Sequence, residues 1–541
     1  MNTTPNRVYG IDLGTTYSCI AYIDEFGKPQ IIENLDGEQT TPSVVYFDGD
    51  EVVVGREAKN VSVMYPDRVV ESVKRLMGTD ETILIDGRSF RPEEISAYIL
   101  RKVVGDAAQQ IGQEIKDVVI TCPAYFNISE REATKIAGQI AGLNVLAVIN
   151  EPTAAALAYG LRSNQDSLAV IYDLGGGTFD VTLIKIQGNE FTVLETGGAR
   201  LLGGKDWDAR VVEYLAQCWQ EEHGASEDPL DDPEVRQDLY NLAEGAKKRL
   251  TTSSETLVPV RYQGKSTRVT LTREKFDELT ADLLEQTISL TKKLLDDAAA
   301  KGHPPFTEFL LVGGSTKMPQ IEAKIREVFG VTPKFNRPDF AVAEGAAFHG
   351  QKLVLKEQIE DEIERGAKSE DEAIRAVVEK SGIAEIAIRS LHDIKITNIT
   401  SHSFGIVADV RVGNNWTEKV VNLITRQTAV PVSVVRDTFG TREMHQRNLN
   451  LRVMENESDE ELVEVADSVE LGNAVMDLPE GLPAGSPIEI AFSLDDSGLL
   501  TMNAKLLADG RQINTTIQTT RIMSQEEIEQ AKARSSAIQV R

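Results

Sequence analysis

The sequence has little of what secreted and membrane-spanning proteins need. It holds three cysteines in 541 residues, Cys19, Cys122 and Cys218, which are far apart and lack metal-ligand spacing. Such cysteine usage argues against a disulfide framework and indicates a reducing compartment. No apolar run approaches the roughly 18 to 20 residues of a membrane-spanning helix, and the first residues do not have the pattern of a secretory signal. We therefore expect a cytoplasmic protein without a membrane partner.

Basic residues are also scarce. The chain has 57 basic and 85 acidic residues, a formal net charge of −28. This charge repels a phosphate backbone, so we expect no nucleic-acid partner, and any nucleotide needs a local site. Apolar residues make up 41% of the chain, which is enough for packed cores. A chain of this length exceeds one hydrophobic core, so two or more domains are expected.

The residue pattern changes along the chain and predicts four parts. Residues 1–355 alternate short apolar runs with amphipathic stretches, as in layered α/β folds, where ligands bind at turns after strands. Residues 356–392 are dense in both charges and predict a helical insert and linker, although a spacer without a task would look the same. Residues 393–523 alternate with period two, which predicts an antiparallel β domain. In residues 524–541, Ser524 and Glu527 form a capping box that predicts a short helix reaching Arg541.

Two similar segments indicate a phosphate site. They are Gly10-Ile-Asp12-Leu-Gly14-Thr15-Thr16 and Tyr172-Asp173-Leu-Gly175-Gly176-Gly177-Thr178. Each places an aspartate and small residues directly after an apolar strand, where glycines let backbone N–H groups approach phosphate and carboxylate oxygens suit Mg²⁺ through water. One such segment alone fits an ordinary tight turn. Their duplication favours two lobes that close on one triphosphate, and the absence of a Gly-x-x-x-x-Gly-Lys-[Ser/Thr] element argues against a P-loop.

Further motifs occur in the order found in 70-kilodalton heat-shock chaperones of the DnaK type, which the sequence resembles over nearly its whole length except the charged insert. They span Val73 to Leu76, Val119 to Phe126, Ile149 to Ala156, Gly203 to Asp206 and Val312 to Thr316. The resemblance implies an α/β actin-like ATPase domain of two lobes and four subdomains, followed by an antiparallel β-sandwich. It also implies slow ATP hydrolysis that controls the binding and release of extended, unfolded polypeptide segments.

The resemblance assigns roles in the ATPase site. Asp12, Glu151 and Asp173 would order Mg²⁺ through water together with the attacking water, Lys74 would lie near the γ-phosphate, and Thr178 would complete the catalytic set. A surface lysine and a helix-start acid are the alternatives for Lys74 and Glu151. K⁺ is a further candidate ion. The other residues expected to contact ATP or ADP are Gly14, Thr15, Thr16, Tyr17, Gly175, Gly176, Gly177, Gly203, Gly204, Lys205, Gly313, Gly314, Ser315 and Asp339.

A helix face is expected to hold the adenosine. Glu244, Lys247, Lys248 and Thr251 are spaced so that they share one face. Where the family has arginines that stack on adenine, this sequence has Lys248 and Lys317. An ammonium group stacks less well than a planar guanidinium, which predicts weaker ATP and ADP binding and faster ADP release. A solvated basic face is the alternative.

The β domain resembles the family's peptide-binding sandwich through Ser403-Phe-Gly405-Ile406 and Ala429-Val-Pro431. The candidate pocket residues are Ile406, Phe439, Leu449 and Leu451, with ordinary sandwich core as the alternative. Asp409 and Arg442 stand where the family has an apolar arch over the peptide, which predicts polar or charged clients.

Two other features depart from the family pattern. The linker Ile394 to Ile399 is less apolar and lacks the family's acid, and the helical lid is almost absent, so the chain is identified as an atypical, lidless member. Without a lid, faster peptide dissociation is expected. The resemblance also implies a J-domain co-chaperone and a nucleotide exchange factor as partners of a monomer. Two rival functions are a small-molecule kinase of the actin and hexokinase superfamily and an ATP-switched binding or assembly module with little refolding activity.

Overall fold

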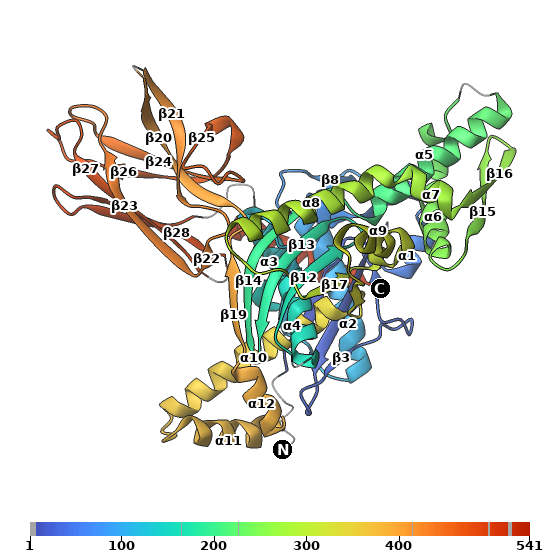
Figure 1. Cartoon of the computed structure of the whole chain (residues 1–541), viewed down its shortest axis with the longest axis horizontal. Helices are drawn as coiled ribbons and strands as arrows, with labels where there is room; N and C mark the ends of the chain where they lie inside the picture. The colour runs from blue at the N-terminus through green and yellow to red at the C-terminus, as the bar shows by residue number, and fades with distance from the viewer. Residues whose placement is uncertain (1–6, 164, 225–226, 414, 496–497, 518–521) are drawn as a thin grey trace.

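The computed structural model describes residues 7–163, 165–224, 227–413, 415–495, 498–517 and 522–541 (Figure 1). Its α/β part is built on two large sheets of similar design. In each, a central strand pairs in parallel with one neighbour and forms an antiparallel hairpin with the next, as β1 does with β10 and β2, and β12 with β17 and β13. The first sheet contains β1 (Tyr9–Asp12), β2 (Tyr17–Ile23), β3 (Pro29–Ile31), β4 (Thr41–Pro42), β10 (Asp117–Cys122) and β11 (Asn144–Asn150). The second contains β12 (Ser167–Leu174), β13 (Phe179–Gln187), β14 (Glu190–Ala199), β17 (Glu308–Val312) and β18 (Lys334–Phe335), and ends with β19 and β22.

Two helices join these sheets into one core. Helix α10 (Ala341–Glu364) packs on β1, β2 and β10, and helix α4 (Glu151–Ser163) packs on β12 and β13 and against α10. The helices approach so closely that a Cβ at Gly345 would lie 1.8 Å from the carbonyl oxygen of Ala154. Glycine is therefore required at this crossing. The shared core fixes the two sheets relative to each other.

Smaller elements extend both lobes. On the first lobe these are α1 (Arg56–Val61), α2 (Pro92–Ile111), α3 (Ile128–Ile140), a sheet of β5 (Val44–Asp48), β6 (Glu51–Val54) and β7 (Val69–Glu71), and a hairpin of β8 (Ile83–Ile85) and β9 (Arg88–Phe90). On the second lobe they are α5 (Gly204–His223), α6 (Pro233–Leu250), β15 (Glu255–Tyr262), β16 (Lys265–Thr272), α7 (Arg273–Leu279), α8 (Ala281–Ala300) and α9 (Pro319–Phe329). Figure 1 shows α5, α6 and the β15–β16 hairpin projecting from the body.

The β domain is a sandwich of two antiparallel sheets, as expected. One sheet has the order β25-β21-β20-β24-β26 and the other β23-β27-β28-β29. Their inner faces form a separate core that includes Phe404, Leu471 and Phe492, all at most 3% exposed. The strands are β20 (Ser403–Val412), β21 (Asn415–Ile424), β23 (Val432–Gly440), β24 (Asn448–Asn456), β25 (Leu462–Val463), β26 (Val469–Asp477), β27 (Pro487–Leu494), β28 (Leu500–Leu506) and β29 (Gln512–Thr516).

The first strand after residue 393 does not belong to this sandwich. Strand β19 (Lys395–Ile399) pairs in parallel with β14 of the α/β part, and its far end pairs with β22 (Ala429–Val430). The β domain was expected to start at residue 393, but the strand pairing places its first strand, β20, at Ser403. The edge of β14 accepts this strand, and the burial of Ile394, which is 2% exposed, fixes where it begins.

The charged insert forms a compact addition to the α/β core. Helix α10 continues to Glu364, and α11 (Glu370–Ser381) and α12 (Glu385–His392) fold back against it. Ile374, Val377 and Ile388 are buried in the same core as the two large sheets. The expectation of solvated helices therefore holds for only one face of each helix.

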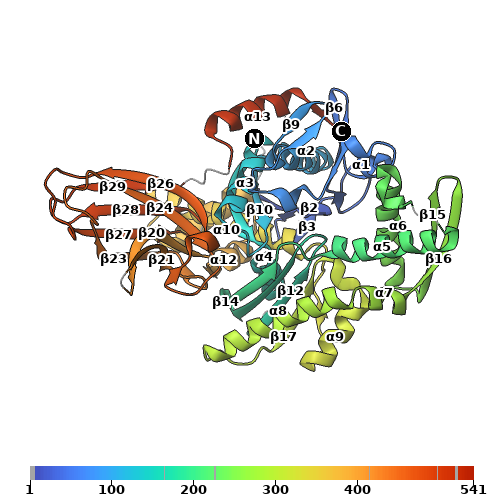
Figure 2. The same ribbon diagram turned by 90° about the horizontal axis from the view of Figure 1, so that it is seen from above.

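The C-terminal helix α13 (Gln525–Ala537) begins at the Ser524 capping box as expected. It ends at Ala537, short of the expected Arg541, and is followed by β30 (Gln539–Val540), which pairs in parallel with β6. Figure 2 shows α13 lying on α2 and α3 of the first lobe, where Arg534 pairs with Glu94 at 2.6 Å. None of the helices in the described ranges is both long and apolar enough to cross a membrane.

Candidate functional site

A cavity of about 690 Å³ lies between the two lobes and brings together both phosphate turns. Each turn follows the end of a central strand, β1 in one lobe and β12 in the other. Gly177, Gly203 and Gly204 are the expected contacts that do not line this cavity. The expected residues that line it are Asp12, Gly14, Thr15, Thr16, Tyr17, Lys74, Glu151, Asp173, Gly175, Gly176, Thr178, Lys205, Glu244, Lys247, Lys248, Thr251, Gly313, Gly314, Ser315, Lys317 and Asp339.

The two turns lie directly against each other. A Cβ at Gly176 would lie 2.3 Å from the hydroxyl oxygen of Thr16, and one at Gly177 would lie 2.5 Å from the methyl group of Thr15. Behind them, a Cβ at Gly203 would lie 2.6 Å from the backbone of Gly177. Side chains at these positions would separate the turns, so the glycines outside the cavity wall support its shape.

Buried carboxylates surround a single lysine at the inner end of the cavity. The Lys74 ammonium donates to Glu151 Oε1 at 2.5 Å, and both residues are buried. Burial and the nearby Glu151 carboxylate raise the pKa of Asp12 to about 7, and the same two causes hold the pKa of Asp173 well above its usual range. Burial alone would lower the pKa of Lys74, but Glu151 and Asp12 raise it. Asp180 is also buried there, so the acids outnumber the cation.

This charge excess fits a divalent cation bound through water. Burial first, and the neighbouring carboxylates second, raise the pKa values of these acids, so their ionised forms would gain from an added positive charge. In the described part of the chain, no three His, Cys, Asp or Glu side chains are grouped so that they could hold a metal ion directly. Mg²⁺ keeps several of its waters in such sites, so carboxylates at a distance suit it.

Ion pairs cross the outer end of the cavity. Lys248 Nζ lies 2.7 Å from Glu244 Oε1 and 4.8 Å from the ring centre of Tyr17, and Lys59 of α1 pairs with the same Glu244 carboxylate from the opposite lobe. Burial would raise the pKa of Glu244, but these two ammonium groups lower it to about 2. Lys317 forms an ion pair with Asp339. Both lysines at the expected adenine positions are therefore bound to carboxylates.

Several polar residues near the site were not predicted from the sequence, including Asp180 of the acid cluster and the lining residues Ser18, Glu38, Gln39 and Thr40. Three others make polar contacts at the site: Lys59 pairs with Glu244, Arg75 Nη2 donates to Gly177 O at 2.8 Å, and Asp208 lies 2.8 Å from Lys247 Nζ. Arg75 could have been predicted, because it directly follows Lys74 in the motif Val73 to Leu76. Lys59 and Asp208 carry no local signal, since their partners are far away in the chain.

The candidate peptide residues divide into buried and partly exposed ones. Ile406 and Leu451 are at most 3% exposed and belong to the sandwich core, whereas Phe439 and Leu449 are half-buried and pack against it. Asp409 and Arg442 meet in an ion pair, with Arg442 Nη1 2.8 Å from Asp409 Oδ2.

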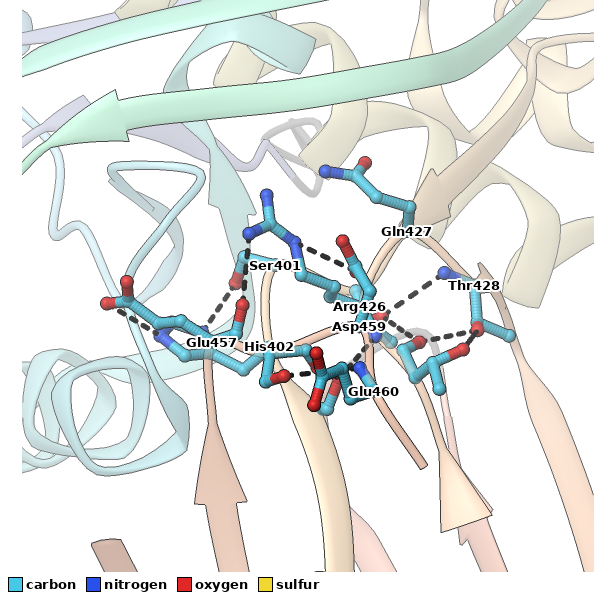
Figure 3. A network of polar contacts seen from close by, with 12 residues as sticks. Ser401, His402, Arg426, Gln427, Thr428, Glu457, Asp459 and Glu460 are labelled. Atoms are coloured by element: carbon cyan, nitrogen blue, oxygen red, sulfur yellow. Dashed lines mark hydrogen bonds and ion pairs between the residues drawn. The ribbon is translucent and has the colours of Figure 1, made fainter. Parts of the chain in front are cut away.

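A polar junction joins the β domain to the α/β part. Figure 3 shows Ser401, His402 and Arg426 close together, with Gln427 beside them and no dashed line joining its side chain to theirs. The Gln427 side chain accepts from Thr196 N at 3.3 Å and donates to Thr196 O at 2.9 Å, so it pairs with β14 as a strand would.

Two further contacts add to this junction. Thr153 of α4 donates its hydroxyl to Asn398 Oδ1 at 3.0 Å, and Ile128 N at the start of α3 donates to Glu455 Oε1 at 3.3 Å. The side chain of Ile128 is buried in the β-domain core. Contacts from both lobes therefore hold the β domain in place.

Comparison with known proteins agrees with this architecture. The family model described as "Hsp70 protein" matches residues 8–84, 80–364 and 367–540. "Chaperone protein DnaK" of Thermosipho melanesiensis is 36% identical over 98% of this chain and 83% of that protein. "Chaperone protein DnaK" of Deinococcus proteolyticus is 37% identical over 97% of this chain and 80% of that protein. Since both the family model and the relatives extend over the nucleotide cavity and the sandwich alike, the chain belongs to the Hsp70 family.

Proposed function

We propose that this protein is an ATP-dependent chaperone that hydrolyses ATP to control the binding and release of extended, unfolded polypeptide segments. The observation that carries the proposal is the cavity between the lobes, where two phosphate turns meet a buried cluster of acids around Lys74. Strand β19 connects this part directly to the β domain. Family membership supports the ATPase activity.

In the ATPase site, the chain positions the nucleotide and its attacking water. The backbone N–H groups of both turns, with Thr15, Thr16 and Thr178, would hold phosphate oxygens. Lys74 would place its ammonium group near the γ-phosphate, and Asp12, Glu151 and Asp173 would hold a hydrated Mg²⁺ and orient the water. When bound, Mg²⁺ would neutralise phosphate charge. K⁺ is a second ion that we propose for this site.

The base would lie at the outer end of the cavity. Glu244, Lys247, Lys248 and Thr251 line it from α6 and its C-terminal cap, and Lys317 and Asp339 line it from the facing loops. Lys248 and Lys317 pair with carboxylates, and their ammonium groups would stack on adenine less well than guanidinium groups because they are not planar. This supports weak nucleotide binding and fast ADP release.

The β domain would hold the polypeptide along an open strand edge. Strand β24 pairs with β26 over its whole length, but its other edge pairs with β20 only from Val453 onwards. Main-chain groups of Asn450 and Arg452 on that side can therefore bind an extended segment, whereas Asn448 O already accepts from Gln446 Nε2; Leu449 and Phe439 offer apolar contacts. Ile406 and Leu451 would form the floor beneath them.

The two rival functions have less support. A small-molecule kinase has no need of the sandwich, and an assembly module with little turnover has no need of the acid cluster around Lys74. Of the expected parts, 1–355 together with the insert 356–392 and strand β19 would form the nucleotide-binding part, the sandwich within 403–523 the peptide-binding part, and 524–541 a C-terminal helical segment. We also propose that the protein is a cytoplasmic monomer that works with a J-domain co-chaperone and a nucleotide exchange factor.

Single-turnover ATP hydrolysis with and without an unfolded peptide tests the function. We expect slow hydrolysis that the peptide accelerates, and loss of hydrolysis in Lys74→Ala with nucleotide binding retained. A matched control is Lys102→Ala, which removes a lysine that pairs with Asp106 at 3.0 Å outside the cavity. A hydrolysis rate that is unchanged by peptide but raised by a sugar would favour the kinase. Tight ATP binding with negligible turnover would favour the assembly module.

A further inference from the structure

The carbonyl oxygens of the second phosphate turn, residues 175–178, all accept hydrogen bonds from the protein. Gly175 O accepts from Gly204 N at 3.0 Å, and Gly176 O accepts from Lys205 N at 2.8 Å. Thr178 O accepts from Gly175 N at 3.0 Å. These three donors belong to the second lobe, so this lobe alone fixes three of the four carbonyl groups.

The fourth carbonyl group is held from the opposite lobe. Arg75 lies in the short helix Val73–Leu76 of the first lobe and donates to Gly177 O from Nε at 3.0 Å and from Nη2 at 2.8 Å. Among the described residues, no other group donates to this oxygen. The orientation of the Gly177 carbonyl therefore depends on Arg75.

The Arg75 guanidinium is itself fixed on several sides. Its Nη2 lies 2.5 Å from Asp206 Oδ2, and its Nη1 donates to Asp206 Oδ1 at 3.3 Å. Asp206 also accepts from Gly203 N at 2.7 Å at the start of α5, so the carboxylate has one position. Arg200 of the second lobe donates from Nη2 to Arg75 O at 3.1 Å. Both the side chain and the backbone of Arg75 are thus held across the two lobes.

The peptide group between Gly177 and Thr178 transmits this contact to the cavity. It is a planar trans group, so its C=O and N–H point in opposite directions. Since Arg75 holds the oxygen, the Thr178 N–H points away from Arg75. Thr178 lines the cavity, whereas Gly177 and Arg75 do not. In the described part of the chain, Thr178 N donates to no protein group, so this N–H is available to a ligand in the cavity.

We propose that Arg75 is a positioning residue for ATP hydrolysis, because it orients the Gly177–Thr178 peptide group so that the Thr178 N–H donates to the terminal phosphate. This inference rests on the proposed function, since it needs ATP in the cavity. Lys74, which directly precedes Arg75, lines the inner end of the same cavity. Arg75 acts through the turn and not on the phosphate, because its charge is paired with Asp206 and it lies outside the cavity wall.

A donor aimed at the terminal phosphate acts on ATP and its transition state but not on ADP. Loss of one such fixed donor lowers a reaction rate by about 100-fold or more. Arg75→Ala frees the Gly177 carbonyl and lets the peptide group rotate, so hydrolysis should fall by about 100-fold while ADP affinity stays within about twofold. Arg75→Lys keeps one donor for Gly177 O but loses the planar fork, so it should recover part of the rate.

The test measures single-turnover ATP hydrolysis and calorimetric ADP binding by the full-length protein. The variants are Arg75→Ala, Arg75→Lys and Asp206→Asn. The last keeps an oxygen that can accept from Gly203 N but removes the charge that fixes the guanidinium, so it should lower the rate less than Arg75→Ala does. Arg210→Ala is the matched control, because Arg210 of α5 pairs with Asp282 at 2.6 Å away from the cavity.

We expect slow hydrolysis with retained ADP binding in Arg75→Ala, partial recovery in Arg75→Lys, and the original rate in the control. Hydrolysis by Arg75→Ala within about twofold of the unaltered protein would overturn the inference and leave the chaperone proposal intact. A joint loss of ADP affinity and hydrolysis, without recovery in Arg75→Lys, would also overturn it, because Arg75 would then only support the shape of the site. Absence of hydrolysis by the unaltered protein would overturn the proposed function itself.

Discussion

Docking of the β domain should depend on the side chain of Gln427. Its amide makes two hydrogen bonds with the backbone of Thr196, which lies on β14 beyond the last residue paired with β19. Gln427→Ala removes both bonds. Gln427 has a positive φ of 62°, and alanine meets a similar backbone cost there, so the change isolates the amide.

The size of the effect follows from these two bonds. Each contributes roughly 0.5 to 1.5 kcal/mol, so their loss shifts docking by about 2 kcal/mol, or about 30-fold. Thr196 is buried in the docked state, and its backbone groups regain water when the β domain moves away. The whole cost therefore falls on docking and not on the stability of either part.

Hydrogen exchange of the amides in Lys395–Ile399 measures this docking. If these amides exchange by release of β19, their exchange should become about 30-fold faster in Gln427→Ala. Gln217→Ala is the control, since Gln217 makes one exposed side-chain contact on α5. Exchange within about twofold of the unaltered protein would refute the reasoning, because the amide would then carry none of the docking energy.

Three further predictions follow. Lys248→Arg, Lys317→Arg and the double variant should bind ATP and ADP more tightly by calorimetry; unchanged affinity in all three would show that stacking is not limiting. Burial, together with Arg131 and Arg426, lowers the pKa of His402 to about 4 from 6.5, so stability present above pH 6.5 should fall as the pH drops towards 4, by about 2 kcal/mol at pH 5. His402→Gln should flatten this loss in urea titrations, and an unchanged pH profile would contradict it. Ile388→Ala should lower the free energy of unfolding by about 2 to 5 kcal/mol. The control Ile386→Ala alters an 80% exposed residue and should lower it by less than about 0.5 kcal/mol. Equal melting temperatures of the two variants would show that the insert does not stabilise the core.

The parts of the site that could be predicted are those whose residues follow one another in the sequence. A strand, an aspartate and glycines follow one another in each phosphate turn, so both turns were visible in the sequence, and the structure brings them together. Lys59 was not predictable, because its partner Glu244 lies 185 positions further along the chain on the opposite lobe. The contact depends on how the lobes close, which no local pattern records.

Two features of the fold were hidden for related reasons. The five residues of β19 fit either neighbouring sheet, so only the open edge of β14 decides where the strand pairs. In the insert, charged residues dominate the composition, although Ile374 and Val377 point into the core. The charged residues on the exposed face dominate the composition of such helices. Whether the apolar face is buried depends on the elements that pack against it.

The way β19 is shared has a practical consequence for dividing this chain into halves. A cut at residue 355 would pass through α10 and would remove from the nucleotide-binding half Ile359, a core residue that is 1% exposed. A cut just before β19 would leave β14 with an unpaired edge, which invites pairing between molecules. An isolated nucleotide-binding half should therefore stay soluble only if it extends to about Ile399, the last residue of β19.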